Sequence, residues 1–325
     1  MFKALVLEQD GNQTSSQIKQ LDESNLPAGN VTIAVEYSSL NYKDGLAITG
    51  KGRVVQSFPM IPGIDLAGTV SSSADQRFKS GDKVVLTGHG IGEKHWGGMA
   101  EKAQVNADFL VPVAKGLDTK KTMQIGTAGL TAMLCIMALE DAGVKPEQGE
   151  ILVTGASGGV GSVAITLLKA LEYQVAAVTG RPENTQTLEI LGASRIISRD
   201  AMLTDNKALD SQLWAGVIDT VGSHILAKAL SQTQYEGAIA ACGLAAGIDL
   251  PTTVMPFILR GIKLVGIDSV YCPYERRLIA WQRLAELLPA SFFELACEQI
   301  SLENVADYAA KIIQGQVKGR IVIKL

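Results

Sequence analysis

A glycine-rich stretch at residues 153–161 has the residue types and spacing that bind a dinucleotide through its phosphates. Ala156, Gly158 and Gly161 match a G-x-G-x-x-G pattern with alanine at the first position. An apolar run typical of a strand precedes the pattern, and a helical pattern follows it. A helix that starts at such a turn directs free N–H groups at an anion. We therefore predict pyrophosphate contacts at Ser157, Gly158, Gly159, Val160 and Gly161; a glycine-rich turn that binds no ligand is the alternative.

The segment after the next strand pattern indicates which dinucleotide is bound. A site for NAD carries an acidic residue about 20 positions beyond the glycine pattern, where it binds the ribose hydroxyls. Here the segment reads Val178-Thr179-Gly180-Arg181-Pro182, without a carboxylate. A hydroxyl and a guanidinium can donate hydrogen bonds to the 2′-phosphate of NADP. We therefore expect NADPH as the cofactor, bound by Thr179, Gly180, Arg181 and, after the third strand, Arg199; for either arginine a solvated loop position is the alternative.

The elements around these residues fall into two patterns. In the first third of the chain, short apolar runs alternate with Gly and Pro, which is typical of a β-rich region. From residue 150 onward strand and helix patterns alternate, which implies a parallel sheet with helices on both faces. Residues 319–325 read as a final strand. The chain is thus expected to be an α/β protein, and its 325 residues allow two domains.

Composition excludes several classes of protein. With 47% hydrophobic residues the chain can bury a large core, so wholesale disorder is excluded. Lys+Arg 29 against Asp+Glu 33 leaves no basic footprint for nucleic acid. The longest apolar stretch, residues 125–139, is shorter than the ~18 residues of a membrane span, and the first residues lack a secretory signal pattern. We expect a cytoplasmic protein that has neither a membrane nor a nucleic acid as a partner.

The cysteines give no sign of a metal or disulfide framework. Cys135, Cys242, Cys272 and Cys297 are far apart and form no C-x-x-C pair. A four-cysteine zinc site or a set of disulfides needs closer and more regular spacing. We therefore expect buried free thiols in a reducing compartment.

Several longer motifs carry a resemblance to a known family. The more specific ones are Asn41-Tyr42-Lys43-Asp44 and residues 250–260; the others are residues 58–70, 95–101, 125–133 and the glycine-rich pattern. With these motifs the chain resembles the zinc-less medium-chain dehydrogenases/reductases, a family of quinone and enoyl reductases. It is most similar to their NADPH-dependent acrylyl-CoA reductase branch, and the resemblance spans most of the chain.

The resemblance implies a fold and the absence of a metal. A Rossmann domain with a doubly wound parallel sheet, residues 121–284, would be inserted into a GroES-like β-barrel catalytic domain formed by residues 1–120 and 285–325. Zinc-dependent relatives carry a cysteine near Asn41 and Gly-His-Glu at the position of Gly63-Ile64-Asp65. Ile64 cannot bind a metal, so no metal site is expected.

The resemblance also implies a reaction, which is hydride transfer from NADPH to the double bond of acrylyl-CoA, giving propionyl-CoA. Tyr42, in the loop where metal-dependent relatives hold a ligand, would position the cofactor or donate to the substrate oxygen. Asn41 would be a neighbouring donor, and Asp44 would orient the loop. The alternatives are a half-buried Tyr42 with a satisfied hydroxyl and Asp44 as a structural turn acceptor. Further cofactor contacts are expected by resemblance at Leu244, Ile258, Ser269 and Gly315.

Other readings of the function and the partners stay open at this point. The fold also suits a quinone or general enone oxidoreductase, and a non-catalytic NADPH-binding protein would share the glycine pattern. Four arginines are candidates for the CoA phosphates or are ordinary surface and interdomain charges: Arg260, Arg276, Arg277 and Arg320. The strand-like run at residues 262–267 would pair with its symmetry mate in a homodimer, unless a loop covers this edge.

Overall fold

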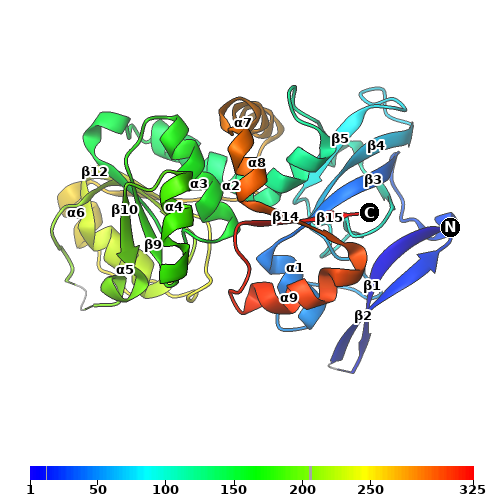
Figure 1. The fold of residues 1–325 in the computed structure, drawn as a ribbon, viewed down its shortest axis with the longest axis horizontal. Coiled ribbons are helices and arrows are strands. Elements are labelled where there is room, and N and C mark those ends of the chain that lie inside the picture. Colours follow the sequence, from blue (N-terminus) through cyan, green and yellow to red (C-terminus); the bar gives the residue numbers. More distant parts are fainter. Residues whose placement is uncertain (12, 205–206) are drawn as a thin grey trace. The chain divides into compact units, whose positions relative to one another are not determined.

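The computed structural model describes residues 1–11, 13–204 and 207–325. Within them the chain divides into two compact units (Figure 1). The first unit comprises Met1–Thr127, Val270–Ala285 and Phe293–Leu325, and the second comprises Ala128–Ser269 and Glu286–Phe292. The second unit therefore interrupts the first along the sequence.

The first unit is built on a seven-stranded sheet that joins segments distant in the sequence. The strand order is β14-β15-β3-β4-β5-β7, and β6 also pairs with β3. The C-terminal strand runs antiparallel to β3, with Ile321 opposite Leu40, so the final strand expected from the sequence is confirmed. The strands of this sheet are β3 (Val31–Leu40), β4 (Asp65–Ser73), β5 (Lys83–Thr87), β6 (Lys102–Val105), β7 (Val111–Pro112), β14 (Cys297–Ser301) and β15 (Arg320–Lys324). A separate hairpin pairs β1 (Phe2–Asp10) with β2 (Gln13–Leu21).

Two helices pack closely in the first unit. Helix α1 (Tyr42–Thr49) lies against α9 (Val305–Ile313). A Cβ added at Gly45 would lie 2.6 Å from a methyl carbon of Ile312, so the two helices approach each other at a glycine. The core beneath the sheet is made of apolar side chains such as Ile33, Leu66 and Leu86, all fully buried.

The second unit contains the predicted parallel sheet. Its strand order is β10-β9-β8-β11-β12-β13, and every pairing is parallel. This is the order of a doubly wound sheet, so the Rossmann prediction is confirmed. The strands are β8 (Glu150–Val153), β9 (Val175–Thr179), β10 (Arg195–Ser198), β11 (Trp214–Asp219), β12 (Thr233–Ala241) and β13 (Lys263–Gly266), and the helices are α3 (Gly159–Ala170), α4 (Thr185–Leu191), α5 (Ser223–Gln232) and α6 (Met255–Arg260). Strands β9 and β11 are buried along their whole length, as expected of strands covered on both faces.

Three helices contain residues of both units: α2 (Thr119–Asp141), α7 (Tyr274–Leu287) and α8 (Ala290–Leu295). Helix α2 is kinked at Gly126, whose φ of 54° and ψ of −161° are not helical. Its 23 residues include an 18-residue window with a mean hydropathy of 1.5, which by length and composition alone is enough to cross a membrane. The prediction that no apolar segment reaches that length was therefore wrong. The helical pattern extends the apolar stretch at both ends. However, 94% of its apolar window is buried inside the protein, as in a core helix.

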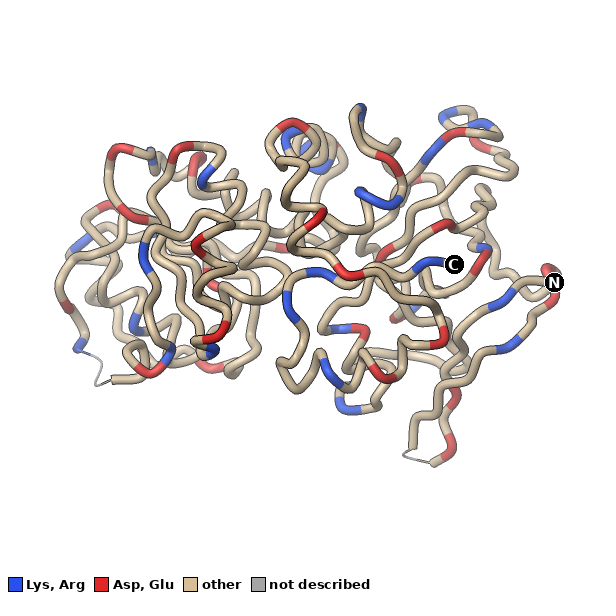
Figure 2. Tube along the Cα trace, viewed as in Figure 1, with Lys and Arg blue, Asp and Glu red and all other residues tan. Residues whose placement is uncertain are grey.

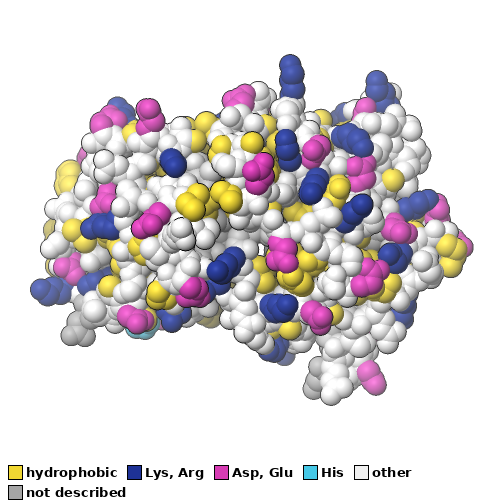
Figure 3. All heavy atoms as spheres, in the orientation of Figure 1, with side chains coloured by type: hydrophobic (Ala, Val, Ile, Leu, Met, Phe, Trp, Pro, Cys, Tyr) yellow, Lys and Arg dark blue, Asp and Glu magenta, His cyan; other side chains and the backbone are white. Residues whose placement is uncertain are grey.

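Charged residues of both signs are mixed along the chain. Figure 2 shows Lys and Arg segments scattered among Asp and Glu segments along the trace. On the face drawn in Figure 3, basic and acidic side chains lie among apolar ones, and no basic stripe crosses it. Recognition of an anionic ligand therefore depends on local groups of residues.

Candidate active site

The glycine-rich turn lies between β8 and α3, as the sequence predicted. Gly155 has a φ of 57°, and Gly158 caps α3 with an extended backbone. The N–H groups of the first helical turn, which begins at Gly159, have no acceptor within the helix, as at every helix N-terminus. A Cβ at Gly161 would lie 2.5 Å from the carbonyl oxygen of Gly155, so only glycine allows the helix to start this close to the turn. The residues present therefore fit a dinucleotide pyrophosphate.

A buried aspartate at the end of β11, which lies beside β8 in the sheet, supports this turn. Asp219 ends β11 and is fully buried, and burial raises its pKa. Its carboxylate accepts hydrogen bonds from Thr154 Oγ1 (2.7 Å) and from the Gly222 backbone N–H (2.8 Å). Thr154 Oγ1 in turn accepts from the Thr220 N–H at 3.0 Å. Asp219 was not singled out from the sequence, although an acid at the end of an apolar strand was a visible signal.

A second glycine lies in close contact with backbone at the same edge of the sheet. A Cβ at Gly243 would lie 1.9 Å from the carbonyl oxygen of Thr220, so only glycine fits after β12. Leu244 and Ser269 follow the ends of β12 and β13, and because these strands are parallel they lie at the same edge as the glycine-rich turn. Leu244 and Ile258 of α6 are exposed apolar side chains, 63% and 72% accessible. Gly315 follows α9 in the first unit, with a φ of 70°.

The residues predicted for the 2′-phosphate lie together at the ends of the neighbouring strands β9 and β10. Ser157 Oγ and Thr179 Oγ1 are 2.9 Å apart, and Thr179 Oγ1 accepts from the Arg181 N–H at 3.1 Å. A Cβ at Gly180 would lie 3.0 Å from the guanidinium carbon of Arg199, so that guanidinium covers Gly180. The structure thus brings Arg199 to the segment that carries Arg181, as we expected. The Arg199 guanidinium and the Thr179 hydroxyl lie at this segment, and Arg181 is the residue after Gly180, so the residue types present suit a phosphate.

The three residues predicted for catalysis differ in exposure. Tyr42 is the first residue of α1 and is 44% exposed. Asn41 and Asp44 are buried and form a capping box at the start of α1. The Asn41 N–H donates to Asp44 Oδ2 at 2.8 Å, and the Ile64 N–H donates to Asp44 Oδ1 at 3.0 Å. Burial raises the pKa of Asp44 to about 7, and the nearby Asp65 carboxylate contributes to this rise.

The side-chain amide of Asn41 points into the protein. It donates to Asp65 Oδ2 at 2.8 Å, and its oxygen accepts from Arg320 Nη1 at 3.2 Å. Ile64, at the position where zinc-dependent relatives have histidine, is buried. Among residues 1–11, 13–204 and 207–325, no three or more His, Cys, Asp or Glu side chains are arranged to hold a metal ion.

Three of the four arginines considered for CoA phosphates have structural roles. Arg277 is 1% exposed and donates to the carbonyl oxygen and hydroxyl of Thr87. Arg320 is 3% exposed and belongs to the cluster around Asn41. Arg260 donates to the carbonyl oxygens of Ser231 and Thr233. Arg277 and Arg320 are buried and Arg260 is half-buried, and each donates hydrogen bonds to acceptors of the protein. The sequence does not reveal these contacts.

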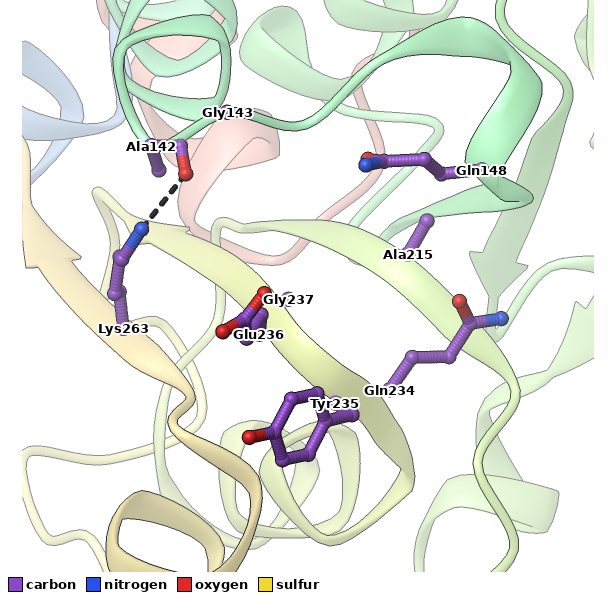
Figure 4. A pocket seen from close by; sticks show the side chains of 9 residues that line it. All are labelled: Ala142, Gly143, Gln148, Ala215, Gln234, Tyr235, Glu236, Gly237 and Lys263. Atoms are coloured by element: carbon purple, nitrogen blue, oxygen red, sulfur yellow. Dashed lines mark hydrogen bonds between the residues drawn. The ribbon is translucent and has the colours of Figure 1, made fainter.

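A cavity of about 330 Å³ lies at the opposite edge of the parallel sheet (Figure 4). It is lined by residues before or at the starts of strands, among them Gln148, Gln234 and Lys263, whose Nζ donates to the Ala142 carbonyl at 2.8 Å. In an open α/β sheet, dinucleotides bind at the carboxyl ends of the strands. This cavity is therefore distinct from the dinucleotide turn.

Replacing Gly161 by alanine tests the close approach of α3. The added Cβ would lie 2.5 Å from Gly155 O and 2.7 Å from the Cα of Ala156, so α3 must move away from the turn. We expect the Kd for NADPH to rise by about tenfold or more, measured by fluorescence titration. The matched control is Gly266→Ala, where no atom lies within 4 Å of the added Cβ. An unchanged Kd in Gly161→Ala would count against the turn as the dinucleotide site.

Comparison with known proteins identifies the family. The alcohol dehydrogenase GroES-like domain model matches residues 27–115, and the zinc-binding dehydrogenase model matches residues 159–286. The chain is 57% identical to the probable acrylyl-CoA reductase AcuI of Escherichia coli over all of both chains, and 52% identical to the acrylyl-CoA reductase AcuI of Ruegeria pomeroyi over 99% of each. The crystal structure of the yhdH oxidoreductase from Salmonella enterica in complex with NADP superposes with a TM-score of 0.98, at 56% identity and 99% coverage of both chains. The predicted GroES-like fold is thereby confirmed, and the chain belongs to the medium-chain dehydrogenase/reductase family.

Proposed function

We propose that the protein reduces the carbon–carbon double bond of acrylyl-CoA to give propionyl-CoA, with NADPH as the hydride donor and without a metal. The observation that carries this proposal is the full-length identity of 57% and 52% to two acrylyl-CoA reductases. The pair of arginines and the absence of a carboxylate after β9 support NADPH over NADH. Ile64 at the histidine position of zinc-dependent relatives supports a reaction without zinc.

The chain's own residues then have distinct tasks. Bound NADPH supplies the hydride, which adds to the β carbon of the enoyl thioester. The amides of the turn and the start of α3, from Ser157 to Gly161, would hold the pyrophosphate, and Thr179, Gly180, Arg181 and Arg199 would hold the 2′-phosphate. Leu244, Ile258, Ser269 and Gly315 would contact the rest of the cofactor.

Tyr42 is the proposed catalytic residue. As negative charge develops on the thioester oxygen, a donor such as the phenol of the partly exposed Tyr42 stabilises it, and the α carbon then takes a proton. Asn41 and Asp44 are engaged inside the protein, so we assign them to positioning this loop and not to contact with the substrate. Residues 1–120 and 285–325 would form the catalytic domain, and residues 121–284 the NADPH-binding domain.

We also propose a cytoplasmic homodimer. Strand β13 is the last strand of the parallel sheet, and an edge strand offers unpaired N–H and C=O groups to a symmetry mate. Cys135, Cys242, Cys272 and Cys297 are free thiols, which suits a reducing compartment.

The acceptor is tested by a panel of acrylyl-CoA, quinones and simple enones with NADPH and NADH. We expect NADPH consumption with acrylyl-CoA, propionyl-CoA as the product identified by mass spectrometry, and kcat/KM about 10²-fold above that for any quinone. Turnover of quinones without turnover of acrylyl-CoA would favour the quinone oxidoreductase. Tight NADPH binding without turnover of any acceptor would favour a non-catalytic protein.

Arg181→Ala tests the cofactor preference. Losing charge-assisted hydrogen bonds to the 2′-phosphate should cost about 1.5–3 kcal/mol, which raises the Kd for NADPH roughly 10–100-fold and leaves the Kd for NADH unchanged. The control is Arg195→Ala on β10, an arginine that pairs with Glu150 away from this site. Equal losses for both cofactors would mean that Arg181 does not bind the phosphate.

Tyr42→Phe tests the catalytic role. Removal of a donor to the developing oxyanion should lower kcat about 10²-fold while the Kd for NADPH changes little. Tyr308→Phe removes a phenol that donates to Glu298 in the same unit and should leave kcat unchanged. If Tyr42 only positions the cofactor, the Kd will rise instead; if neither constant changes, Tyr42 has no role in the reaction.

A further inference from the structure

A buried polar cluster lies next to α1 and contains residues that the proposed mechanism does not use. Ser39 belongs to β3, Asp65 is the first residue of β4 and Arg320 is the first residue of β15. Asp65 is fully buried, and Arg320 is 3% exposed. Charged side chains are rarely buried so completely unless they are paired, and such pairs are specific features of a fold.

The Asp65 carboxylate is surrounded by donors. Its Oδ2 accepts from Asn41 Nδ2 at 2.8 Å, from Ser39 Oγ at 2.5 Å and from the Thr127 N–H at 2.9 Å. Its Oδ1 accepts from Thr127 Oγ1 at 2.5 Å. Four donors on two oxygens suit a carboxylate, which when ionised only accepts. A neutral amide of the same shape would bring an N–H group against one of these donors or force it to turn.

Arg320 completes the surroundings of Asn41. Its Nη1 donates to Asn41 Oδ1 at 3.2 Å, its Nη2 donates to Ser39 Oγ at 3.0 Å, and its Nε donates to the Gln124 carbonyl at 3.1 Å. Nη2 lies 4.0 Å from Asp65 Oδ2. The amide of Asn41 thus has its NH₂ group against the anion and its oxygen against the cation. Turning the amide over would place both ends against the wrong partner.

The cluster is also tightly packed. A Cβ added at Gly126, in the kink of α2, would lie 2.6 Å from both Arg320 Nη2 and Asp65 Oδ2. The kink therefore brings backbone into contact with the ion pair. This packing keeps both charged groups from moving away from Asn41.

Asn41 is the N-cap of α1, and Tyr42 is the next residue. The backbone at Asn41 therefore sets the position from which the Tyr42 side chain extends. We propose that Asp65 and Arg320 are positioning residues for the reaction, because they fix Asn41 and through it the place of Tyr42. This inference rests on the proposed function.

The charges around Asp44 give the proposal a diagnostic property. The charged groups of the cluster are Asp65 on β4, Arg320 on β15 and Asp44 itself, and the Cys297 thiol on β14 lies near Arg320. On α9, which packs against α1, Asp307 and Lys311 are exposed. With its pKa at about 7, Asp44 is a carboxylate above that pH and accepts from Asn41 and Ile64. As the pH falls through about 7, protonation weakens the cap, so activity that depends on the cap is lost on the acid side.

Removing the Asp65 charge and removing the Arg320 charge should therefore move the acid limb of the pH profile in opposite directions. Asp65→Asn removes a like charge near Asp44, so the limb of kcat/KM should move to lower pH by about one unit. Arg320→Met removes the opposite charge, so the limb should move to higher pH by about one unit. Both variants should also lower kcat about tenfold or more while the Kd for NADPH stays within a factor of two to three.

Matched variants and a second measurement keep the test decisive. Asp75→Asn removes a half-buried carboxylate that is paired with Arg77 away from this cluster, and should change neither limb nor kcat. If a single variant fails to fold, the double variant Asp65→Asn with Arg320→Met restores the charge balance, and its limb should return towards that of the wild type. Hydrogen exchange followed by mass spectrometry on the NADPH-free protein should show faster exchange in the first turn of α1 in all three variants, with α3 unchanged.

The outcomes separate this inference from the proposed function. Limbs that shift in opposite directions, with faster exchange at α1, support the positioning role. Unshifted limbs together with wild-type exchange at α1 overturn it, and so does a fall in activity that leaves the pH profile unchanged. If the wild type reduces another acceptor and not acrylyl-CoA, the proposed function fails, and the same variants are compared on that acceptor.

Discussion

The buried hydrogen-bond network around Asp65 and Arg320 is the interaction on which the first unit most depends. It joins the start of β4, the end of β3, the kink of α2 and the start of β15, and one of its bonds spans 279 residues of sequence. Two charges taken out of water are tolerated only because every donor and acceptor around them has a partner. The network therefore holds the C-terminal strand beside β3, in a sheet most of whose strands lie before the Rossmann segment.

In the second unit the corresponding constraint is steric. At Gly161 and Gly243 an added Cβ would overlap backbone atoms, which lets α3 and the segment after β12 approach the carboxyl edge of the sheet. Asp219 and Thr154 hold the neighbouring strand end with buried hydrogen bonds. Free helix amides at one end of this edge, and the Arg199 guanidinium beside Gly180, form a surface that suits a phosphorylated dinucleotide. The proposed cofactor site is therefore formed more by backbone atoms, exposed at glycines, than by particular side chains.

Much of this could be read from the sequence because the relevant patterns are local. Strand–turn–helix periodicity around residue 158 predicted the Rossmann unit, and the C-terminal strand was visible in its composition. Tyr42 is exposed whereas Asn41 and Asp44 are buried, although all three belong to one short motif. The sequence could not predict this difference. Neighbours in sequence at a helix start point in different directions, and which direction meets solvent depends on what packs there.

The sequence by itself determined the family, the order of the elements and the residue types available to bind NADPH, because backbone periodicity and glycine spacing act over a few residues. Tertiary structure alone decided which polar side chains make their hydrogen bonds inside the protein. Arg277 and Arg320, which the sequence left open as phosphate ligands, are buried, and Asp65 and Asp219 became the centres of two networks. A buried charge needs partners, and these come from segments that only the folded sheet brings together.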